Sequence, residues 1–386
     1  MASQKIMLLF EFPSMNGGEH SMLACLKHLM QAQQSPTQFE FCAAGPTSGP
    51  LAEQLQQLNV PLAKFLTHDA AGNKYSPIQL QDQMQSLLNS VQPDVVHSNS
   101  LSMSRNVGRM SDEIFETTLR SGHLRDIMKL NRTAIHDLNC NDALIAVSNA
   151  TRNFHVSQGL DPHKCQTIYN GVDTQTFAPA VDPTQRPACL NQLPEDAILV
   201  LNVGQICLRK GQLDLATAIV NLLPKHPELH LVMVGRRHSQ KAESMRYETS
   251  IQKVFSDRGF ADHLHCLGDR SQIQNLMNAA DVLVHAAKQE PLGRVLLEAA
   301  ACELPIIATD VGGTPEIVTH QQDAILVSPD VAGLQAGICR FLDAGDTAAV
   351  RANSAGKVAR TRFSVDKAAT PLAVFWSQLQ RKSDPN

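Results

Sequence analysis

The strongest constraint on the fold is an alternation of short β-rich segments with longer helical segments, which occurs twice along the chain. In the first half the predicted strands are 6–12, 39–43, 94–97, 115–118, 143–147 and 166–169. In the second half they are 197–203, 229–234, 263–267, 281–285, 304–309 and 324–327. Strands that alternate with helices form parallel sheets whose faces the helices cover. We therefore expect an α/β protein with two parallel sheets.

The two series are separated by a segment rich in Pro, Asp, Thr and Gln between Gly171 and Glu195. A chain of 386 residues is long enough for two separate hydrophobic cores. We predict an N-terminal Rossmann-like domain, a linker, a C-terminal Rossmann-like domain, and a final helix that carries Trp376 and packs on the N-terminal domain. Their predicted bounds are 1–172, 173–196, 197–365 and 366–386.

Charge and composition exclude several classes of protein. The net charge is −4 and no run of five or six Lys and Arg residues occurs, so we expect no nucleic-acid partner. No stretch reaches about 18 apolar residues, which argues against a spanning helix. The nine cysteines are scattered, without ligand spacing, as in reduced cytoplasmic proteins. We expect a cytoplasmic protein. Peripheral contact with the inner face of a membrane is compatible with the same observations.

In each half, the first predicted strand is followed by one glycine-containing segment. Open parallel sheets bind ligands at the carboxyl ends of their strands, where helix N-termini attract anions. Gly17 and Gly18 open a helix after the first strand, which suits either a phosphate contact or a simple tight turn. After 197–203, Arg209 and Lys210 bring two cations that suit a diphosphate, or form a solvated basic pair.

The segment 288–299 contains more candidate functional residues than any other. It directly follows the predicted strand 281–285 and is predicted to form a loop and then a helix beginning at Gly293. Arg294 and Glu298 are four residues apart and share one helix face, while Glu290 lies in the preceding loop. Two carboxylates so placed can accept hydrogen bonds from sugar hydroxyls. The alternative is an ordinary amphipathic helix whose Glu298 pairs with Arg294. The next strand is followed by a second Gly-Gly pair, Gly312 and Gly313.

Taken together, these residues resemble family 4 of the retaining glycosyltransferases, which have the GT-B fold. The match is strongest for the Glu-x7-Glu signature of Glu290 and Glu298, within "EPLGRVLLEAAACELPIIATDVGGTPEIV". Supporting matches are "IYNGVDTQTFAP", "VGQICLRKG", "MVGRR" and "NAADVLVHAAKQE". The resemblance implies two Rossmann-like domains whose parallel sheets face each other across a cleft.

The resemblance also implies roles for individual residues. Glu290 would bind hydroxyls of the donor sugar, Glu298 those of the ribose, and Lys210 the diphosphate. The N-terminal domain would mainly bind the acceptor. The other residues that would contact the donor are Gly17, Gly18, Gln205, Gly235, Leu292, Gly293 and Arg294.

The family's histidine that contacts the donor sugar matches His123, because His123 comes after the predicted strand 115–118. A satisfied surface histidine is the competing interpretation, and His97, which also follows a strand, ranks second. We count His123, Glu290, Lys210 and Arg209 as catalytic candidates. Weaker candidates for acceptor binding are Asn16, His97, Arg125 and Asp126.

One position departs from the family pattern. The family usually has Arg after the glycine of "VGR", where this chain has Gln205. The substitution removes one positive charge from the predicted diphosphate site. We hypothesise that Arg209, next to Lys210, supplies the missing cation.

The family implies a retaining, metal-independent transfer in which the leaving phosphate deprotonates the acceptor. We find no Asp-x-Asp metal motif and predict no cofactor. The co-substrate would be a nucleotide diphosphate-sugar, a UDP-sugar first and GDP-mannose second. The acceptor would be a small molecule, a glycan or a lipid-linked compound. The alternatives are a nucleotide-sugar epimerase of the same fold and a catalytically silent sugar-nucleotide-binding protein.

Overall fold

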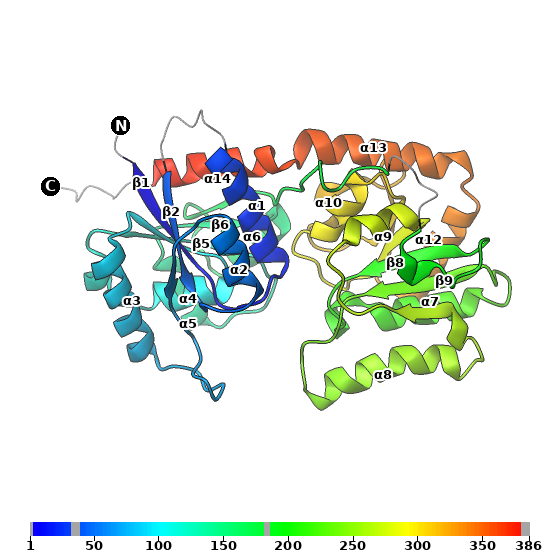
Figure 1. The fold of residues 1–386 in the computed structure, drawn as a ribbon, viewed down its shortest axis with the longest axis horizontal. Coiled ribbons are helices and arrows are strands. Elements are labelled where there is room, and N and C mark those ends of the chain that lie inside the picture. The colour runs from blue at the N-terminus through cyan, green and yellow to red at the C-terminus, as the bar shows by residue number, and fades with distance from the viewer. Residues whose placement is uncertain (1–2, 32–38, 181–185, 380–386) are drawn as a thin grey trace. The chain divides into compact units, whose positions relative to one another are not determined.

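The computed structural model describes residues 3–31, 39–180 and 186–379, and it contains two compact units (Figure 1). Unit 1 consists of Met1–Gly171 together with Val365–Asn386, and unit 2 of Val172–Ser364. Each unit is an α/β domain built on one parallel sheet, so the predicted fold class is confirmed.

The sheet of unit 1 has seven parallel strands and helices on both of its faces. In spatial order the strands are β3 (Leu62–Lys64), β2 (Phe39–Gly45), β1 (Gln4–Leu9), β4 (Val95–Ser98), β5 (Leu119–Leu124), β6 (Ala143–Ala146) and β7 (Cys165–Thr167). The helices are α1 (Gly17–Gln31), α2 (Pro50–Gln57), α3 (Pro77–Val91), α4 (Leu101–Gly108), the 3-10 turn η1 (Asp112–Phe115), α5 (Arg132–Asn139), α6 (Asn149–Ser157) and α14 (Val365–Gln378).

The sheet of unit 2 has six parallel strands and repeats the same order of connections. These are β10 (Leu264–Cys266), β9 (Leu229–Val234), β8 (Ile198–Val203), β11 (Val282–His285), β12 (Ile306–Thr309) and β13 (Ile325–Val327). The helices are η2 (Ala188–Leu190), η3 (Leu208–Lys210), α7 (Gln212–Leu222), α8 (Ala242–Ser256), η4 (Ala261–His263), α9 (Ile273–Ala279), α10 (Arg294–Ala301), α11 (Thr314–Ile317), α12 (Val331–Leu342) and α13 (Asp346–Arg362).

Strand β1 shows why these segments form central strands. Its apolar residues are all fully buried, because side chains alternate between the two covered faces of the sheet. Ile6 and Leu8 pack into the core beneath α1 and α14, whereas Met7 and Leu9 pack into the core beneath α3 and α4. A strand buried on both faces must be apolar along its length, as this one is.

Helix α14 returns from the end of the chain to complete the core of unit 1. Trp376, the only tryptophan of the chain, is fully buried there. Its indole ring packs edge-on against Phe39 and Phe41, with ring centroids 6.0 and 5.9 Å away. Without this helix the aromatic side of β2 would be exposed to water.

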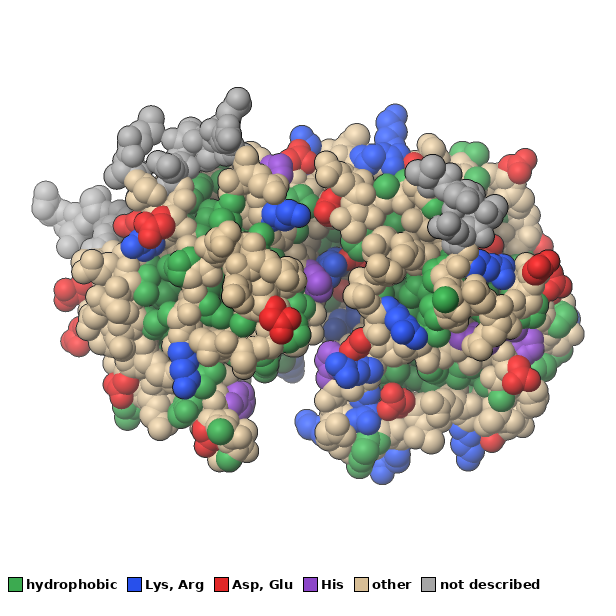
Figure 2. Space-filling view, in the orientation of Figure 1, with side chains coloured by type: hydrophobic (Ala, Val, Ile, Leu, Met, Phe, Trp, Pro, Cys, Tyr) green, Lys and Arg blue, Asp and Glu red, His purple; other side chains and the backbone are tan. Residues whose placement is uncertain are grey.

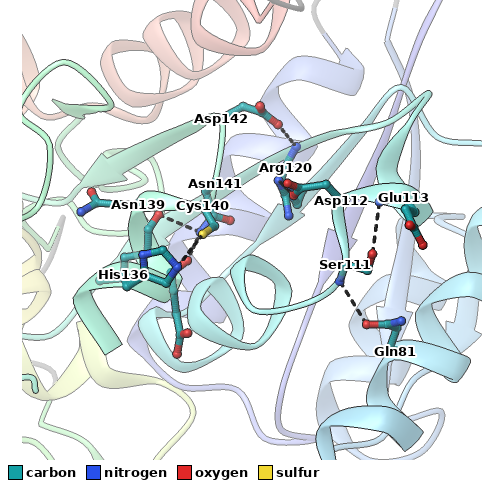
Figure 3. A network of polar contacts seen from close by, with 12 residues as sticks. Gln81, Ser111, Asp112, Glu113, Arg120, His136, Asn139, Cys140, Asn141 and Asp142 are labelled. Carbon is teal, nitrogen blue, oxygen red and sulfur yellow. Dashed lines mark hydrogen bonds and ion pairs between the residues drawn. The ribbon is translucent and has the colours of Figure 1, made fainter. Parts of the chain in front are cut away.

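The prediction of a strand at 115–118 is wrong. The structure has the 3-10 turn η1 followed by β5, which starts at Leu119 in register with Val95. Ser111 caps the turn, and the Arg120 guanidinium pairs with Asp112 at 2.6 Å (Figure 3). The same guanidinium lies over the ring of Phe115. These contacts hold the segment as a turn, so the strand begins four residues later.

The other predicted strands are present, 229–234 with its predicted bounds and the rest with shifted ends, and one strand was missed. Strand β3 has three residues at the sheet edge and none of them is buried, so it lacks an apolar pattern. Residues 181–185 of the predicted linker and residues 380–386 of the predicted last helix lie outside the described residues.

All nine cysteines are free. On the face shown in Figure 2, acidic and basic side chains are interspersed. Within the described ranges, no helix combines the length and the apolar character needed to cross a membrane.

Candidate functional site

Both units place polar side chains where their strand order reverses. In an open parallel sheet, that switch point leaves a crevice at the carboxyl ends of the two central strands. In unit 2 these strands are β8 and β11, and in unit 1 they are β1 and β4. We describe the cluster of each unit separately.

The cluster of unit 2 is centred on Glu290, which is buried in the loop after β11. Its Oε2 accepts hydrogen bonds from Lys210 Nζ at 2.6 Å and from His285 Nε2 at 2.8 Å. Among the described residues no partner is recorded for Oε1, the second carboxylate oxygen. One oxygen of Glu290 is therefore held in place, and the other can accept from a ligand.

The charge states of this cluster follow from burial and pairing. Burial alone would raise the pKa of Glu290, but the charge of Lys210 and the hydrogen bond from His285 outweigh it and lower the pKa. Burial, and then the charge of Lys210, lower the pKa of His285. Near neutral pH the cluster therefore holds a carboxylate, an ammonium group and a neutral imidazole.

Backbone contacts join the loops that carry these side chains. The N–H of Lys288 donates to the carbonyl of Arg209 at 2.8 Å, and Arg209 Nη1 donates to the carbonyl of Gln289 at 3.2 Å. Gly211 adopts φ 66°, and a Cβ there would lie 1.9 Å from the carbonyl oxygen of Ala286. Only glycine allows this close approach of the two loops.

The second Gly-Gly pair supports Glu290 from behind. The N–H of Gly313 donates to the carbonyl of Glu290 at 2.9 Å. Gly312 adopts φ 55°, and a Cβ there would lie 2.0 Å from the same carbonyl oxygen. These glycines thus permit close backbone packing against Glu290 in addition to forming a turn.

Helix α10 begins immediately after this loop, at Arg294. The preceding residue, Gly293, has φ 105° and no side chain caps the first turn, while Leu292 is buried beside it. The first N–H groups of a helix have no intrahelical partner and carry partial positive charge. This uncapped helix start suits an anion such as a phosphate.

Glu298 lies one turn inside α10 and is buried. Arg294 Nη2 lies 2.5 Å from its Oε1 as an ion pair, yet this buried oxygen receives no hydrogen bond of good geometry. Burial raises the pKa of Glu298, and the charge of Arg294 opposes the shift. The predicted Arg294 pairing is therefore present.

A small pocket of about 190 Å³ lies at the ends of β8, β9 and β10. Gly235 lines it with φ 120°, and a Cβ there would lie 2.2 Å from the carbonyl oxygen of Gly204. The neighbouring Gln205 is half-buried, and its carbonyl accepts from Gln212. The complete lining is Ile206, Met233, Gly235, Arg236, Glu248, Ile251, Gln252, Cys266 and Gly268.

In unit 1 the two candidate histidines lie within strands and do not follow them as predicted. His97 is in β4 and His123 in β5, where both are buried. His97 was already the last residue of the predicted strand 94–97, and β4 extends one residue further. His123 was placed after a strand because the strand predicted at 115–118 lies at Leu119–Leu124 instead. His97 Nε2 lies 2.7 Å from His123 Nδ1, and the indole N–H of Trp376 donates to His97 Nδ1 at 3.2 Å.

Burial lowers the pKa of both histidines, and the charge of Arg125 lowers it further. The pKa of His97 falls to about 3. Both imidazoles are therefore neutral in the folded protein near neutral pH.

Arg125 connects the loops at the carboxyl ends of four strands. Its guanidinium donates to the carbonyl of Asn99 at 3.0 Å, to Asn99 Oδ1 at 2.9 Å and to Asn170 Oδ1 at 2.8 Å. A Cβ on Gly18 would lie 2.8 Å from Arg125 Cδ, so the helix start after β1 rests on this side chain. Gly17 has nothing within 4 Å of such a Cβ.

The remaining acceptor candidates lie on the exposed surface of unit 1. Asn16 precedes α1, and its N–H donates to Glu19 Oε2 at 3.0 Å. Asp126 is exposed, and its carbonyl accepts from His155 Nε2. Neither residue contacts the paired histidines through a recorded hydrogen bond.

Four residues of these clusters escaped the sequence analysis, namely His285, Asn99, Asn170 and Ser121, whose Oγ lies 2.8 Å from His97 Nδ1. His285 ends a buried apolar strand, which was the one available signal. Within the described parts of the chain, no group of three or more His, Cys, Asp or Glu side chains is placed to hold a metal ion.

The fold and the polar clusters define an α/β protein of two Rossmann-like domains, each with a cluster of polar side chains near its switch point. Two family models match the chain: residues 15–176 match Glycosyltransferase Family 4, and residues 190–358 match Glycosyl transferases group 1. The chain belongs to glycosyltransferase family 4 and has the GT-B fold.

Curated relatives match over part of their length. The chain is 27% identical to the lipopolysaccharide core biosynthesis mannosyltransferase LpsB of Rhizobium meliloti, over 62% of this chain and 66% of the relative. It is 31% identical to the α-maltose-1-phosphate synthase of Mycobacterium tuberculosis, over 53% of each. The matches thus span about half to two thirds of these relatives.

Solved structures of similar fold cover almost the whole chain. A crystal structure of Anabaena Alr3699/HepE in complex with UDP and glucose superposes with a TM-score of 0.82, at 22% identity, over 97% of this chain and all of that one. The sucrose-phosphate synthase of Thermosynechococcus elongatus gives a TM-score of 0.79 at 18% identity, over 97% and 99%. At such identities the likeness establishes the fold.

Proposed function

We propose that this chain is a retaining glycosyltransferase that moves a hexose-type sugar from a nucleotide diphosphate-sugar to a hydroxyl group. The observation that carries the proposal is the cluster of unit 2, where Lys210, Glu290 and the uncapped start of α10 meet at the switch point. A cation and a helix N-terminus bind a diphosphate, and paired carboxylates bind hydroxyl groups. This combination fits a sugar nucleotide.

The parts of the donor are assigned to the parts of the cluster. The diphosphate would lie against the start of α10, with Lys210 turning from Glu290 to a phosphate oxygen. Glu290 Oε1 would accept from the sugar, and Glu298 Oε1, which lacks a good hydrogen bond, would accept from the ribose. The pocket beside Gly235 would take the base.

Catalysis would then be electrostatic. As the bond between the sugar and the phosphate breaks, charge accumulates on the leaving diphosphate, and Lys210, Arg209 and the helix dipole stabilise it. The leaving phosphate would take the proton of the acceptor hydroxyl on the same face. This route forms the new glycosidic bond with retained configuration and uses no metal.

A UDP-sugar is the first candidate donor. Structures with the same fold contain UDP or UDP-glucose, which supports this choice. GDP-mannose is the second candidate donor, which the similarity to the mannosyltransferase LpsB supports. The acceptor class stays a small molecule, a glycan or a lipid-linked compound.

The test is thermal stabilisation of the full chain by UDP, GDP and ADP, each with and without a metal chelator. A nucleotide at about a hundred times its dissociation constant should add about 2.7 kcal/mol to the free energy of unfolding. Stabilisation that survives the chelator supports metal-independent binding. Absence of stabilisation by all three nucleotides contradicts the proposal.

Retention is tested by slow hydrolysis of the donor in the absence of an acceptor. With UDP-glucose, which is an α-glycoside, NMR should show α-glucose before mutarotation. Initial release of β-glucose would show inversion. Binding without hydrolysis of UDP-glucose or GDP-mannose would favour a silent binding protein.

A further inference from the structure

The paired histidines of unit 1 form one hydrogen-bonded chain with Ser121 and Trp376. Trp376 Nε1 lies 3.2 Å from His97 Nδ1, Ser121 Oγ lies 2.8 Å from the same nitrogen, and His97 Nε2 lies 2.7 Å from His123 Nδ1. The rings of His97 and His123 cross at 83°, edge to face. Every member belongs to unit 1.

The direction of this chain is determined at Trp376. An indole nitrogen can only donate, so His97 Nδ1 must accept and carries no hydrogen. The Ser121 hydroxyl can donate to the same nitrogen. His97 is neutral, with one ring hydrogen, which must therefore be on Nε2.

The same reasoning passes from His97 to His123. Because His97 Nε2 donates, His123 Nδ1 accepts, and the hydrogen of the neutral His123 must be on its Nε2. Among the described residues no partner is recorded for this N–H. It can donate only to a lone pair, such as that of an oxygen.

We propose that Trp376 and Ser121, acting through His97, hold His123 as a neutral hydrogen-bond donor toward an oxygen atom of a ligand bound to unit 1. His97, Ser121 and Trp376 are positioning residues in this scheme. His123 does not act as a general base, since its Nδ1 already accepts and its Nε2 already carries hydrogen. The identity of the ligand rests on the proposed function, whereas the tautomers do not.

The ligand class follows from this polarity. A fixed N–H donor recognises a hydroxyl or carboxylate oxygen, and it cannot accept from an ammonium group. A sugar with an amine at the contacted position would leave the N–H of His123 facing another donor. Ligands that differ at this position should therefore be discriminated.

The tautomers can be observed directly in the full chain labelled with ¹⁵N-histidine, without nucleotide, at pH 7.5. Protonated and unprotonated ring nitrogens differ greatly in ¹⁵N shift. The expected spectrum shows both histidines with hydrogen on Nε2 and none on Nδ1, and His97→Gln and His123→Gln assign the signals. A wild-type spectrum with hydrogen on Nδ1 of either residue overturns the proposal.

Two single variants and their combination test the source of the bias. Ser121→Ala keeps the packing and the indole donor on His97 Nδ1, so it should retain the wild-type pattern. Trp376→Phe keeps a buried aromatic ring but leaves only the Ser121 hydroxyl, which can donate or accept, so this variant and the double variant should show a second set of signals with hydrogen on Nδ1. An unchanged spectrum of the double variant, with an unchanged circular dichroism spectrum, contradicts the assignment.

The same samples separate this proposal from the proposed function. Stabilisation by UDP tests unit 2 and needs none of these four residues. If UDP stabilises the protein and the ¹⁵N spectrum shows hydrogen on Nδ1 of either histidine, only the tautomer scheme fails. If the spectrum is right and no nucleotide binds, only the proposed function fails.

Discussion

The two domains have the same strand order but different chemistry at their switch points. Unit 2 gathers charged groups, Lys210, Glu290, Arg294 and Glu298, around a helix start. Unit 1 gathers neutral imidazoles, and its one central cation, Arg125, is already bound by asparagine oxygens. One topology thus supports an anion-type site in one domain and a neutral hydrogen-bonding site in the other.

The contrast has a physical origin in what each cluster must do without a ligand. Buried charges need partners, and Lys210 pairs with Glu290. Buried imidazoles avoid the same cost by staying neutral. Function resides in such clusters and cannot be inferred from the fold.

The largest expected effect comes from Lys210→Ala, which would remove the main cation of unit 2. A charge-assisted hydrogen bond contributes about 1.5–3 kcal/mol, so UDP affinity should fall by about a hundredfold. Isothermal calorimetry measures the loss. The matched control is Lys288→Ala. The Lys288 side chain lies in the neighbouring loop and forms its ion pair with Asp214, at 2.7 Å.

Arg209→Ala tests whether this residue replaces the family arginine that is absent at Gln205. We expect a loss of about tenfold in UDP affinity, the lower end for one charge-assisted bond. Wild-type affinity in this variant, alongside a loss in Lys210→Ala, would reject the replacement hypothesis.

Glu298→Gln should weaken UDP binding by about tenfold, because an amide is a weaker acceptor than a carboxylate. The contact is tested by comparing UDP with 2′-deoxy-UDP and 3′-deoxy-UDP in both proteins. Wild type should prefer UDP, and the variant should discriminate less. Equal discrimination in both proteins would show that Glu298 does not contact the ribose.

The neutral histidines predict an acid-sensitive N-terminal domain. The pKa of His97 is about 3 in the folded protein and about 6.5 when unfolded, so the unfolded chain binds more protons between these values. The stability of unit 1 should therefore fall as pH decreases below about 6.5, by about 1.4 kcal/mol per pH unit from His97 alone.

Urea unfolding at pH 7.5 and 5.5 measures this dependence. Trp376 fluorescence reports on unit 1 alone, because it is the only tryptophan and is buried there. His97→Gln removes the titrating group and should reduce the pH dependence. The same slope in both proteins would mean that His97 titrates normally.

The smallest effect is expected from a pair of glycine variants. Gly18→Ala places a Cβ against Arg125 and should destabilise unit 1 by about 1 kcal/mol. Gly17→Ala meets nothing within 4 Å and should change stability by less than about 0.5 kcal/mol. Equal stabilities by Trp376 fluorescence would show that the Gly18 contact is unimportant.

The strand positions could largely be predicted because buried parallel strands are apolar along their length. The segment 229–234 was predicted with its observed bounds. Two errors have local causes: η1 is held by contacts of Arg120, and β3 is a short, partly exposed edge strand. The secondary-structure propensities of the residues contain no information about side-chain contacts made after folding or about a strand's place at the edge of a sheet.

The residues of unit 2 that carry the proposal could be selected from the sequence because they lie close together in motifs. The contacts of unit 1 could not. His97 faces Ser121 through strand register, and Trp376 reaches His97 from 279 positions away. Such contacts depend on how the finished domain packs.

The return of α14 to unit 1 has a consequence for protein synthesis. The ribosome completes residues 1–171 before it makes all of unit 2, and only then α14. At about 5–20 residues per second this delay is on the order of 10–40 s. During that time the nascent first domain lacks Trp376, and the part of its core that α14 covers is exposed to water.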